Sequence, residues 1–314
     1  MMKVVMPGGS GHVGQMIRRL MEPQGWQFTV LTRKPGKPDE MAWDAKTLGP
    51  WQSEIDGADI VLNLAGRSVD CRYTQANLKE MLDSRVDSTR VVGEAIAQAK
   101  LPPKLWLQAS TATIYAHRFD QPNGDDGILG GGEPNAPNKW KVSIEIAKAW
   151  EQELDRANTP RTRKVALRSS MIMSIEAGSV FDVLARLAKR GLGGPAASGR
   201  QYVSWIHELD FVRALQFLID HEEFSGPVNV CSPNPLPNRE FMAILRQAVG
   251  ARFSFPLPAL LLEIGAVLRR TDTELILKSR RVVPSRLLGA GFTFEFPTWP
   301  EAAKDLAKHR FGIR

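Results

Sequence analysis

VVMPGGSGHVG, residues 4–14, is the stretch of sequence that decides the fold. A short apolar run comes directly before glycines at positions 8, 11 and 14, and an amphipathic stretch, residues 13–20, follows them. This order predicts a strand, a tight turn and a helix start, whose free N–H groups and partial positive charge suit a diphosphate. A glycine-rich turn without a ligand is the simpler alternative, because glycine spacing alone is weak evidence. We therefore expect a dinucleotide-binding turn formed by Gly8, Ser10, Gly11, His12, Val13 and Gly14.

The second predicted strand, residues 28–32, ends in basic residues that indicate which dinucleotide is bound. Dinucleotide-binding folds usually place Asp or Glu here, to accept a hydrogen bond from the ribose 2′-hydroxyl of NAD. In this chain Thr32 is followed by Arg33 and Lys34. A guanidinium attracts the 2′-phosphate that a carboxylate would repel. We therefore predict NADP(H) as the cofactor, with an ordinary solvated pair of cations as the alternative.

Composition excludes several classes of protein. With 314 residues, 43% hydrophobic and 24% charged, the chain can build one large core or two domains. Its apolar run 257–268 contains Pro258 and Glu263 and is too short to span a bilayer, so we expect no membrane partner. The basic residues behind the net charge of +7 are scattered, so we expect no nucleic acid either. The two cysteines, Cys71 and Cys231, lie far apart in sequence and favour a protein without a structural disulfide, in the cytoplasm or, as the alternative, in an organelle lumen.

Strands and helices alternate through the first half of the chain, as in a parallel sheet covered on both faces. After residue 168 short strands, prolines and isolated helices replace that alternation. We predict an α/β fold with a Rossmann-type doubly wound parallel sheet over residues 1–170, which also takes in parts of 200–230. Residues 171–314 are expected to form a smaller C-terminal α/β substrate domain. The polar, glycine-rich stretch 116–139 predicts a mobile loop over the site.

Several segments together resemble the extended, atypical short-chain dehydrogenase/reductase superfamily. They are the glycine turn, Leu64-Ala65-Gly66, and the strand end at residues 109–115. In the second half, GLGGP at 191–195 and SWIH at 204–207 resemble its sugar-nucleotide epimerase-like branch, which carries a C-terminal region of unknown function. The resemblance covers nearly the whole chain and implies the fold more strongly than the reaction. It also implies that Leu64, Ala65 and Gly66 close over the cofactor.

The proton-transfer pair that this superfamily usually uses is absent. Its enzymes place a Tyr and, four residues later, a Lys on one helix, so that the Lys lowers the pKa of the Tyr. None of the three tyrosines here is followed by Lys at that spacing. Ser143 and Ala147 occupy the expected positions, and Lys141 and Lys148 lie out of helical register. The epimerase-like branch generally lacks the pair too, so its absence agrees with the resemblance.

The remaining candidates are few. We expect Thr111 and Tyr115 to position and polarise the reacting oxygen, whereas Ser143 has no evident base beside it in the sequence. Glu80, Arg85 and Arg168 are candidates for cofactor contact, with a structural ion pair as the alternative for the arginines. His207 is expected to tie the two domains together. No cluster of His, Cys, Asp and Glu has metal-ligand spacing, so we predict no metal.

The function expected from these features is an NADP(H)-dependent oxidoreductase or epimerase, lacking the usual Tyr–Lys pair. It would exchange a hydride with a small polar substrate, and nucleotide-linked molecules are among the candidates. The alternative is a non-catalytic NADP(H)-binding redox sensor or regulatory protein. We expect a monomer or a homodimer whose partner is a small molecule.

Overall fold

Seven parallel strands form the main sheet of the computed structural model, which describes residues 1–133, 137–251, 253–255 and 274–313. In chain order the strands are β1 (Met2–Pro7), β2 (Trp26–Thr32), β3 (Glu40–Ala42), β4 (Ile60–Asn63), β5 (Leu105–Thr111), β6 (Arg163–Ser169) and β10 (Gly226–Val230). Their spatial order is β10-β6-β5-β4-β1-β2-β3. The order therefore reverses between β1 and β4, and in such sheets ligands bind beyond the strand ends at the reversal. The predicted doubly wound α/β fold is confirmed.

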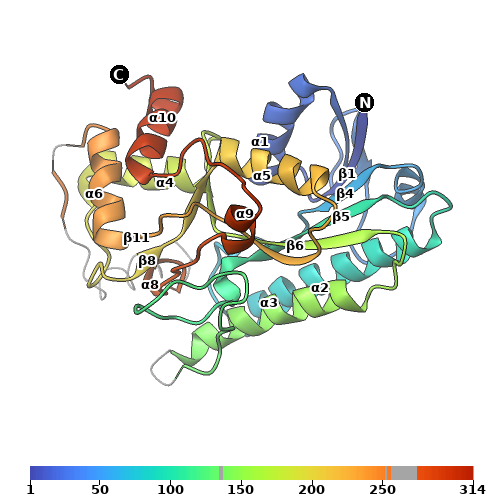
Figure 1. Cartoon of the computed structure of the whole chain (residues 1–314), viewed down its shortest axis with the longest axis horizontal. Coiled ribbons are helices and arrows are strands. Elements are labelled where there is room, and N and C mark those ends of the chain that lie inside the picture. Colours follow the sequence, from blue (N-terminus) through green and yellow to red (C-terminus); the bar gives the residue numbers. More distant parts are fainter. Residues whose placement is uncertain (134–136, 252, 256–273, 314) are drawn as a thin grey trace.

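Four helices cover the two faces of this sheet: α1 (His12–Met21), α2 (Gln75–Gln98), α3 (Asn138–Arg156) and α5 (Glu208–Asp220). The other described helices are α4 (Val180–Leu187), α6 (Asn238–Ala248), α8 (Glu274–Leu277), α9 (Ser285–Gly289) and α10 (Trp299–Phe311). Figure 1 shows α1 and α5 above the strands and α2 and α3 below them.

Alternation along each strand explains the two layers. Successive strand side chains point to opposite faces of a sheet. On β5, Leu105 and Leu107 face the core that contains Phe211 of α5, whereas Trp106 between them faces the core that contains Val91 of α2. All three strand residues are at most 2% exposed. Strands buried on both faces are typical of parallel sheets, and the unbroken apolar runs of the sequence follow from that.

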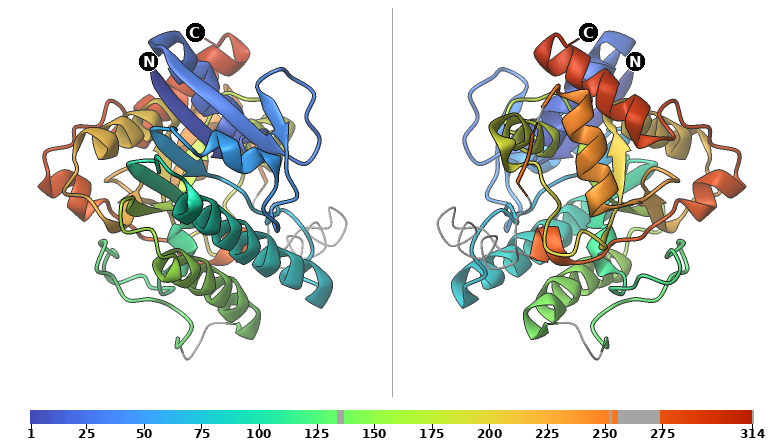
Figure 2. Two further views of the ribbon diagram at one scale, coloured as in Figure 1. Left: turned by 90° about the vertical axis from the view of Figure 1, so that its right-hand side faces the viewer. Right: turned by 90° about the vertical axis from the view of Figure 1, so that its left-hand side faces the viewer.

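A smaller lobe packs beside the sheet. Its strands are β7 (Met171–Met173) with β9 (Trp205–His207), and β8 (Tyr202–Val203) with β11 (Leu236–Pro237). Its core lies between α4, α6 and α10, where Trp299 stacks on Phe241 with ring centroids 4.2 Å apart and lies 5.0 Å from Trp205. Figure 2, right, shows α6 and α10 packed against each other.

The chain crosses between sheet and lobe more than once. Strand β10 pairs with β6, although the whole stretch 171–207 comes between them in sequence. The expected boundary near residue 170 and the expected share of 200–230 stay predictions; residues 208–230 contain α5, which packs on the sheet, and β10, which pairs with β6. His207 is buried at the start of α5, where its Nδ1 accepts from Leu209 N, and its Nε2 lies 3.2 Å from Asp305 of α10.

Among the described residues, no helix combines the length and apolar character that crossing a bilayer requires. The apolar run 257–268, on which the prediction about membranes partly depended, lies outside the described residues.

Candidate dinucleotide and substrate site

The glycine turn is packed so tightly that side chains are excluded from two of its positions. Gly8 has φ +75°, and a Cβ there would lie 2.7 Å from Ala65 Cα. A Cβ on Gly14 would lie 2.1 Å from the carbonyl oxygen of Gly9, a contact that no backbone tolerates. These close approaches bring the turn against the segment after β4 and against the first turn of α1, as the sequence pattern predicts for glycines.

Gly11 differs from the other two glycines, because a Cβ there would meet only Gly8 O, at 3.6 Å. It is the N-cap of α1, and no side chain caps the helix. The N–H groups of the first turn are therefore open to a ligand in front of Gly11, and the helix dipole favours an anion there. These residues fit a diphosphate.

The segment after β4 is held in place from within the sheet. Asn63 is fully buried, and its Nδ2 donates to Gln108 Oε1 of β5 at 3.0 Å. Its Oδ1 accepts a hydrogen bond of 3.0 Å from Ala65 N. Leu64 N donates to Pro7 O at 2.8 Å, so Leu64, Ala65 and Gly66 run alongside the glycine turn.

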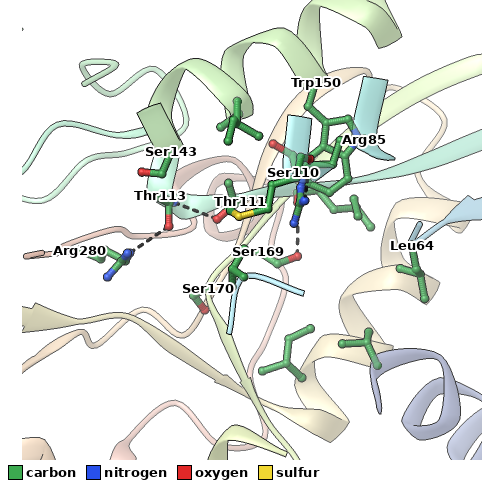
Figure 3. Close-up of a pocket in the computed structure, with 18 of the residues that line it drawn as sticks. Leu64, Arg85, Ser110, Thr111, Thr113, Ser143, Trp150, Ser169, Ser170 and Arg280 are labelled. Atoms are coloured by element: carbon green, nitrogen blue, oxygen red, sulfur yellow. Dashed lines mark hydrogen bonds between the residues drawn. The ribbon is translucent and has the colours of Figure 1, made fainter. Parts of the chain in front are cut away.

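A cavity of about 300 Å³ opens at the carboxyl ends of β4, β5 and β6. Figure 3 shows its lining, with Leu64 on one side and Arg280 on the opposite side. Its lining residues are Val13, Leu64, Val69, Tyr73, Met81, Arg85, Ala109, Ser110, Thr111, Thr113, Ser143, Ile146, Ala147, Trp150, Leu167, Ser169, Ser170, Ile172, Phe211 and Arg280. The cavity therefore begins at the glycine turn and ends deep beside α3.

The structure brings several predicted residues together. Ser10 Oγ lies 3.2 Å from Thr32 Oγ1, which joins the turn to the end of β2. Arg33 and Lys34 follow directly and are exposed, where a 2′-phosphate could meet them. His12 is also exposed, and its Cε1 would lie 3.3 Å from a Cβ on Gly178, so its ring packs against the segment before α4.

Thr111 and Ser143 both line the cavity. Thr111 Oγ1 accepts from Thr113 N at 3.1 Å, which leaves its hydroxyl proton for an oxygen atom in the cavity. Ser143, for which the sequence shows no base, has one in the structure: its hydroxyl lies 2.5 Å from Oε1 of Glu274, which is fully buried. Ala147 lies on the same wall, one turn further along α3.

Arg85 and Glu80 both lie on α2, but their side chains have different surroundings. The half-buried Arg85 lines the cavity, stacks over Trp150 with 4.9 Å between its Cζ and the ring centroid, and donates from Nη1 to Met81 O. Burial lowers the pKa of Arg85 to about 10. Glu80 instead forms an exposed ion pair with Arg67. The structure therefore leaves Arg85, and not Glu80, facing a ligand in the cavity.

Arg168 lies in a buried ion pair. Its Nε and Nη2 donate to the two carboxylate oxygens of Glu151 at 2.8 and 2.7 Å, and Ser110 Oγ donates to the same carboxylate at 2.5 Å. Only 6% of Arg168 is exposed. Burial alone would lower the pKa of Arg168, but the bonds with Glu151 raise it. The structure shows the ion pair that was the alternative for this residue, and cofactor contact by Arg168 stays a prediction.

Tyr115 is likewise turned away from the cavity. Its hydroxyl accepts from Arg168 Nη1 and donates to Asn229 Oδ1, both at 2.8 Å, and only 2% of the residue is exposed. Burial raises the pKa of Tyr115 to about 12. The expected catalytic role of Tyr115 stays a prediction: the β5 strand turns through a short 3-10 helix, residues 112–114, which carries this ring into the core and out of the cavity lining.

We expect Tyr115→Phe to destabilise the fold without touching the cavity. Removing the hydroxyl leaves Arg168 and Asn229 each short of a partner in the core, which costs about 1–2 kcal/mol of unfolding free energy. Urea unfolding measures this loss, and a fluorescence titration should show unchanged NADPH affinity. A variant with native stability but impaired turnover would restore Tyr115 to the reaction.

The stretch 116–139, expected to be a mobile loop over the site, makes several contacts with the rest of the chain, as far as residues 116–133 and 137–139 are described. Asn123 bridges to Val282, and Tyr115 to Leu129. The Asp125 carboxylate accepts from Asn229 N at 2.6 Å and from Ser285 Oγ at 2.7 Å. These bonds tie the stretch to β10 and to the start of α9. Residues 134–136 lie outside the described part of the chain.

The inner end of the cavity contains residues that the sequence did not single out. Arg280 Nε donates to Thr113 Oγ1 at 3.0 Å, and Lys278 Nζ donates to Thr113 O at 2.7 Å. Thr113 comes two residues after Thr111, so its position just after β5 could have indicated it. No local pattern in the sequence indicates Arg280 or Lys278. Within the described ranges, no three His, Cys, Asp or Glu side chains are grouped as metal ligands would be.

A glycine turn and a cavity at the reversal point of a parallel sheet define a dinucleotide-binding α/β protein. The chain belongs to the NAD dependent epimerase/dehydratase family, whose model matches residues 4–231. A second model, a domain of unknown function called DUF1731, matches residues 257–306.

Relatives of full length carry the same description. The epimerase family protein SDR39U1 of Bos taurus is 30% identical, over 97% of this chain and 99% of its own. The epimerase family protein YfhF of Bacillus subtilis is 26% identical, over 98% and 99%.

Solved structures agree with the fold. The human epimerase family protein SDR39U1, crystallised with NADPH, superposes with a TM-score of 0.85 at 28% identity, covering 98% of this chain and 99% of its own. A nucleoside-diphosphate sugar epimerase from Corynebacterium glutamicum gives a TM-score of 0.76 at 24% identity, over 98% of this chain and 58% of its own. The second likeness concerns the fold alone.

Proposed function

We propose that this protein binds NADP(H) and exchanges a hydride with a small polar molecule held in the cavity at the ends of β4, β5 and β6. The observation that carries the proposal is the uncapped N-terminus of α1 at Gly11, next to that cavity and followed at β2 by Arg33. The human relative crystallised with NADPH supports the choice of dinucleotide. On the composition of the chain, we propose a cytoplasmic monomer or homodimer with no nucleic-acid or membrane partner.

Each group in the site has a definite task under this proposal. Gly11 and the first turn of α1 hold the diphosphate, Arg33 holds the 2′-phosphate, and Arg85 lies beside the cofactor in the cavity. The nicotinamide, when bound, would supply or accept the hydride. Thr111 orients the substrate by donating its hydroxyl proton to the reacting oxygen, because its own acceptor site is occupied by Thr113 N.

We expect Arg33→Asp to weaken NADPH binding by roughly 10- to 100-fold while NADH binding stays nearly unchanged, since a charged hydrogen bond to a phosphate contributes about 1.5–3 kcal/mol. Fluorescence titrations with each dinucleotide measure both affinities. Lys37→Asp, an equal charge change at an exposed residue of the same segment, is the matched control. Equal losses for NADPH and NADH in Arg33→Asp would show that this side chain does not meet a 2′-phosphate.

Turnover is tested with NADPH deuterated at C4 of the nicotinamide. Passage of the label from the cofactor to a metabolite in a cell extract is the expected result. Ala147 stands where the superfamily usually has its Lys, and this favours a second candidate, a non-catalytic NADP(H)-binding regulatory protein or redox sensor. Selective NADPH binding with no label transferred would support that candidate instead.

A further inference from the structure

Residues 174–179, which join β7 to α4, run from the smaller lobe to the helix that begins at the glycine turn. Gly178, with φ +80°, lies against the ring of His12, the first residue of α1. A Cβ on this glycine would be 3.3 Å from His12 Cε1. Just before this segment, Ile172 of β7 lines the cavity together with Val13 of α1. The lobe therefore borders the proposed position of the diphosphate.

An ion-pair cluster of Arg19, Glu176 and Glu208 holds the same segment further along α1. Arg19 Nε donates to Glu176 Oε1 at 2.8 Å, and Arg19 Nη2 donates to Glu208 Oε2 at 2.6 Å. The same Glu208 oxygen accepts from Ile175 N at 3.1 Å. Arg19 follows His12 by seven residues, which is about 10 Å along a helix axis. The cluster therefore fastens residues 174–179 to α1 at a distance from the first turn of the helix.

The carboxylates of this ion-pair cluster are only partly compensated. One guanidinium bonds to two carboxylates, and within the described part of the chain Glu176 Oε2 is buried without a hydrogen-bond partner. Burial raises the pKa of Glu208, although Arg19 lowers it. Separating the segment from α1 would let water reach these oxygens, and this hydration offsets part of the cost of breaking the ion pairs. The contact is therefore suited to open and close while the apolar cores stay packed.

We propose that Arg19 and Glu176 are positioning residues that hold residues 174–179 against α1 beside the bound dinucleotide, so that this segment gates the entry and release of NADP(H). The inference rests on the proposed function, since it assigns a gate to the same dinucleotide site. The ion pairs lie away from the proposed position of the diphosphate, so they control access to the site and not the contacts within it. Loosening them should speed association and dissociation alike, whereas loss of a direct contact changes mainly the dissociation rate.

The test is stopped-flow fluorescence of NADPH with the unaltered protein and with Glu176→Ala. Association is followed at several NADPH concentrations, and dissociation is followed by displacing bound NADPH with an excess of NADP⁺. We expect both rate constants to rise by about 2- to 5-fold in the variant, the scale of a partly exposed ion pair. The Kd for NADPH, measured separately by equilibrium titration, should stay nearly unchanged.

Glu22→Ala is the matched control, because it removes the carboxylate that pairs with the adjacent Arg18 on the same helix. Both rate constants should be the same in this control as in the unaltered protein. Glu176→Gln keeps an oxygen that accepts from Arg19 but loses the charge, so it should speed both rates by a smaller factor than Glu176→Ala. The urea midpoints of the three variants should lie close together, which separates an effect on the gate from a general loss of structure.

Unchanged rate constants in Glu176→Ala would overturn the gate. A rise in the dissociation rate alone would overturn it too, because it would show that Glu176 stabilises the bound dinucleotide directly. Equal acceleration in Glu22→Ala would count against it as well, since the effect would then follow from the change in charge alone. Normal NADPH binding with unchanged rates defeats the gate alone, whereas failure of the unaltered protein to bind NADPH would defeat the proposed function.

Discussion

We expect the Gly14→Ala variant to lose both measurable NADPH binding and several kcal/mol of stability. The added methyl would lie 2.1 Å from Gly9 O and 2.5 Å from Gly9 C and Cα, and these are backbone atoms that cannot turn aside as a side chain would. The βα turn must therefore open, which we expect to cost at least about 3 kcal/mol of unfolding free energy, the upper range for overpacking. Affinity for NADPH should fall by about 100-fold or more, equivalent to roughly 3 kcal/mol. Urea unfolding and a fluorescence titration measure the two effects.

Gly11→Ala tests NADPH binding at the same turn with little effect on how the turn packs. Its Cβ would meet only Gly8 O at 3.6 Å, so the loss of stability should be at most about 1 kcal/mol, the scale of an N-cap change. The methyl would stand in front of the N-terminus of α1, where we place the diphosphate, and NADPH affinity should still fall. Native affinity in Gly11→Ala would mean that the diphosphate lies elsewhere.

After Gly14→Ala, we expect Arg168→Met to cause the next largest loss of folding stability. It leaves the Glu151 carboxylate, 9% exposed, in the core with only the Ser110 hydroxyl as a partner among the bonds described above. Breaking a buried ion pair from one side costs about 3–5 kcal/mol. The free energy of unfolding in urea measures this loss. NADPH affinity, measured on the folded fraction, should not change, because the side chain is turned away from the cavity.

The double variant Arg168→Met/Glu151→Leu checks the reason for that loss. With both charges gone, most of the stability should return, since an apolar pair can replace a buried ion pair at little cost. A surface control is Lys79→Met, which breaks an exposed pair with Asp83 and should leave the free energy of unfolding nearly unchanged. If Arg168→Met instead kept its stability and lost NADPH affinity, the original expectation of cofactor contact would be reinstated.

Structural features that depend on residues close together in the sequence could be predicted. The turn at Gly8 to Gly14 depends on residues within one βα unit, and the apolar runs that predict β4, β5 and β6 depend only on strand period and burial. Thr111 and Ser143 reach the cavity because the carboxyl ends of parallel strands and the adjoining helix always meet there. Each of these positions therefore depends on residues that lie nearby in the sequence.

Partners from distant elements were not predictable. Arg168 and Glu151 are 17 residues apart, and which arginine neutralises which carboxylate depends on how α3 packs on β6. Tyr115 was a candidate because it follows a strand end, but a single turn of 3-10 helix redirected it. Glu274 and Arg280 bond to Ser143 and Thr113 from more than 130 residues further along the chain, and no periodicity carries information over that distance.

The position of β10 has a consequence for biosynthesis. During translation β6 emerges long before residues 226–230, which pair along it in the finished sheet. Until then β6 is an open edge whose backbone groups and apolar Val165 and Leu167 are exposed to other chains. Because N-terminal segments begin folding first, the first part of the second lobe leaves the ribosome before the sheet is closed. The nascent chain is thus most prone to aggregate over the interval in which residues 171–225 are being made, and a holding chaperone would matter most in that interval.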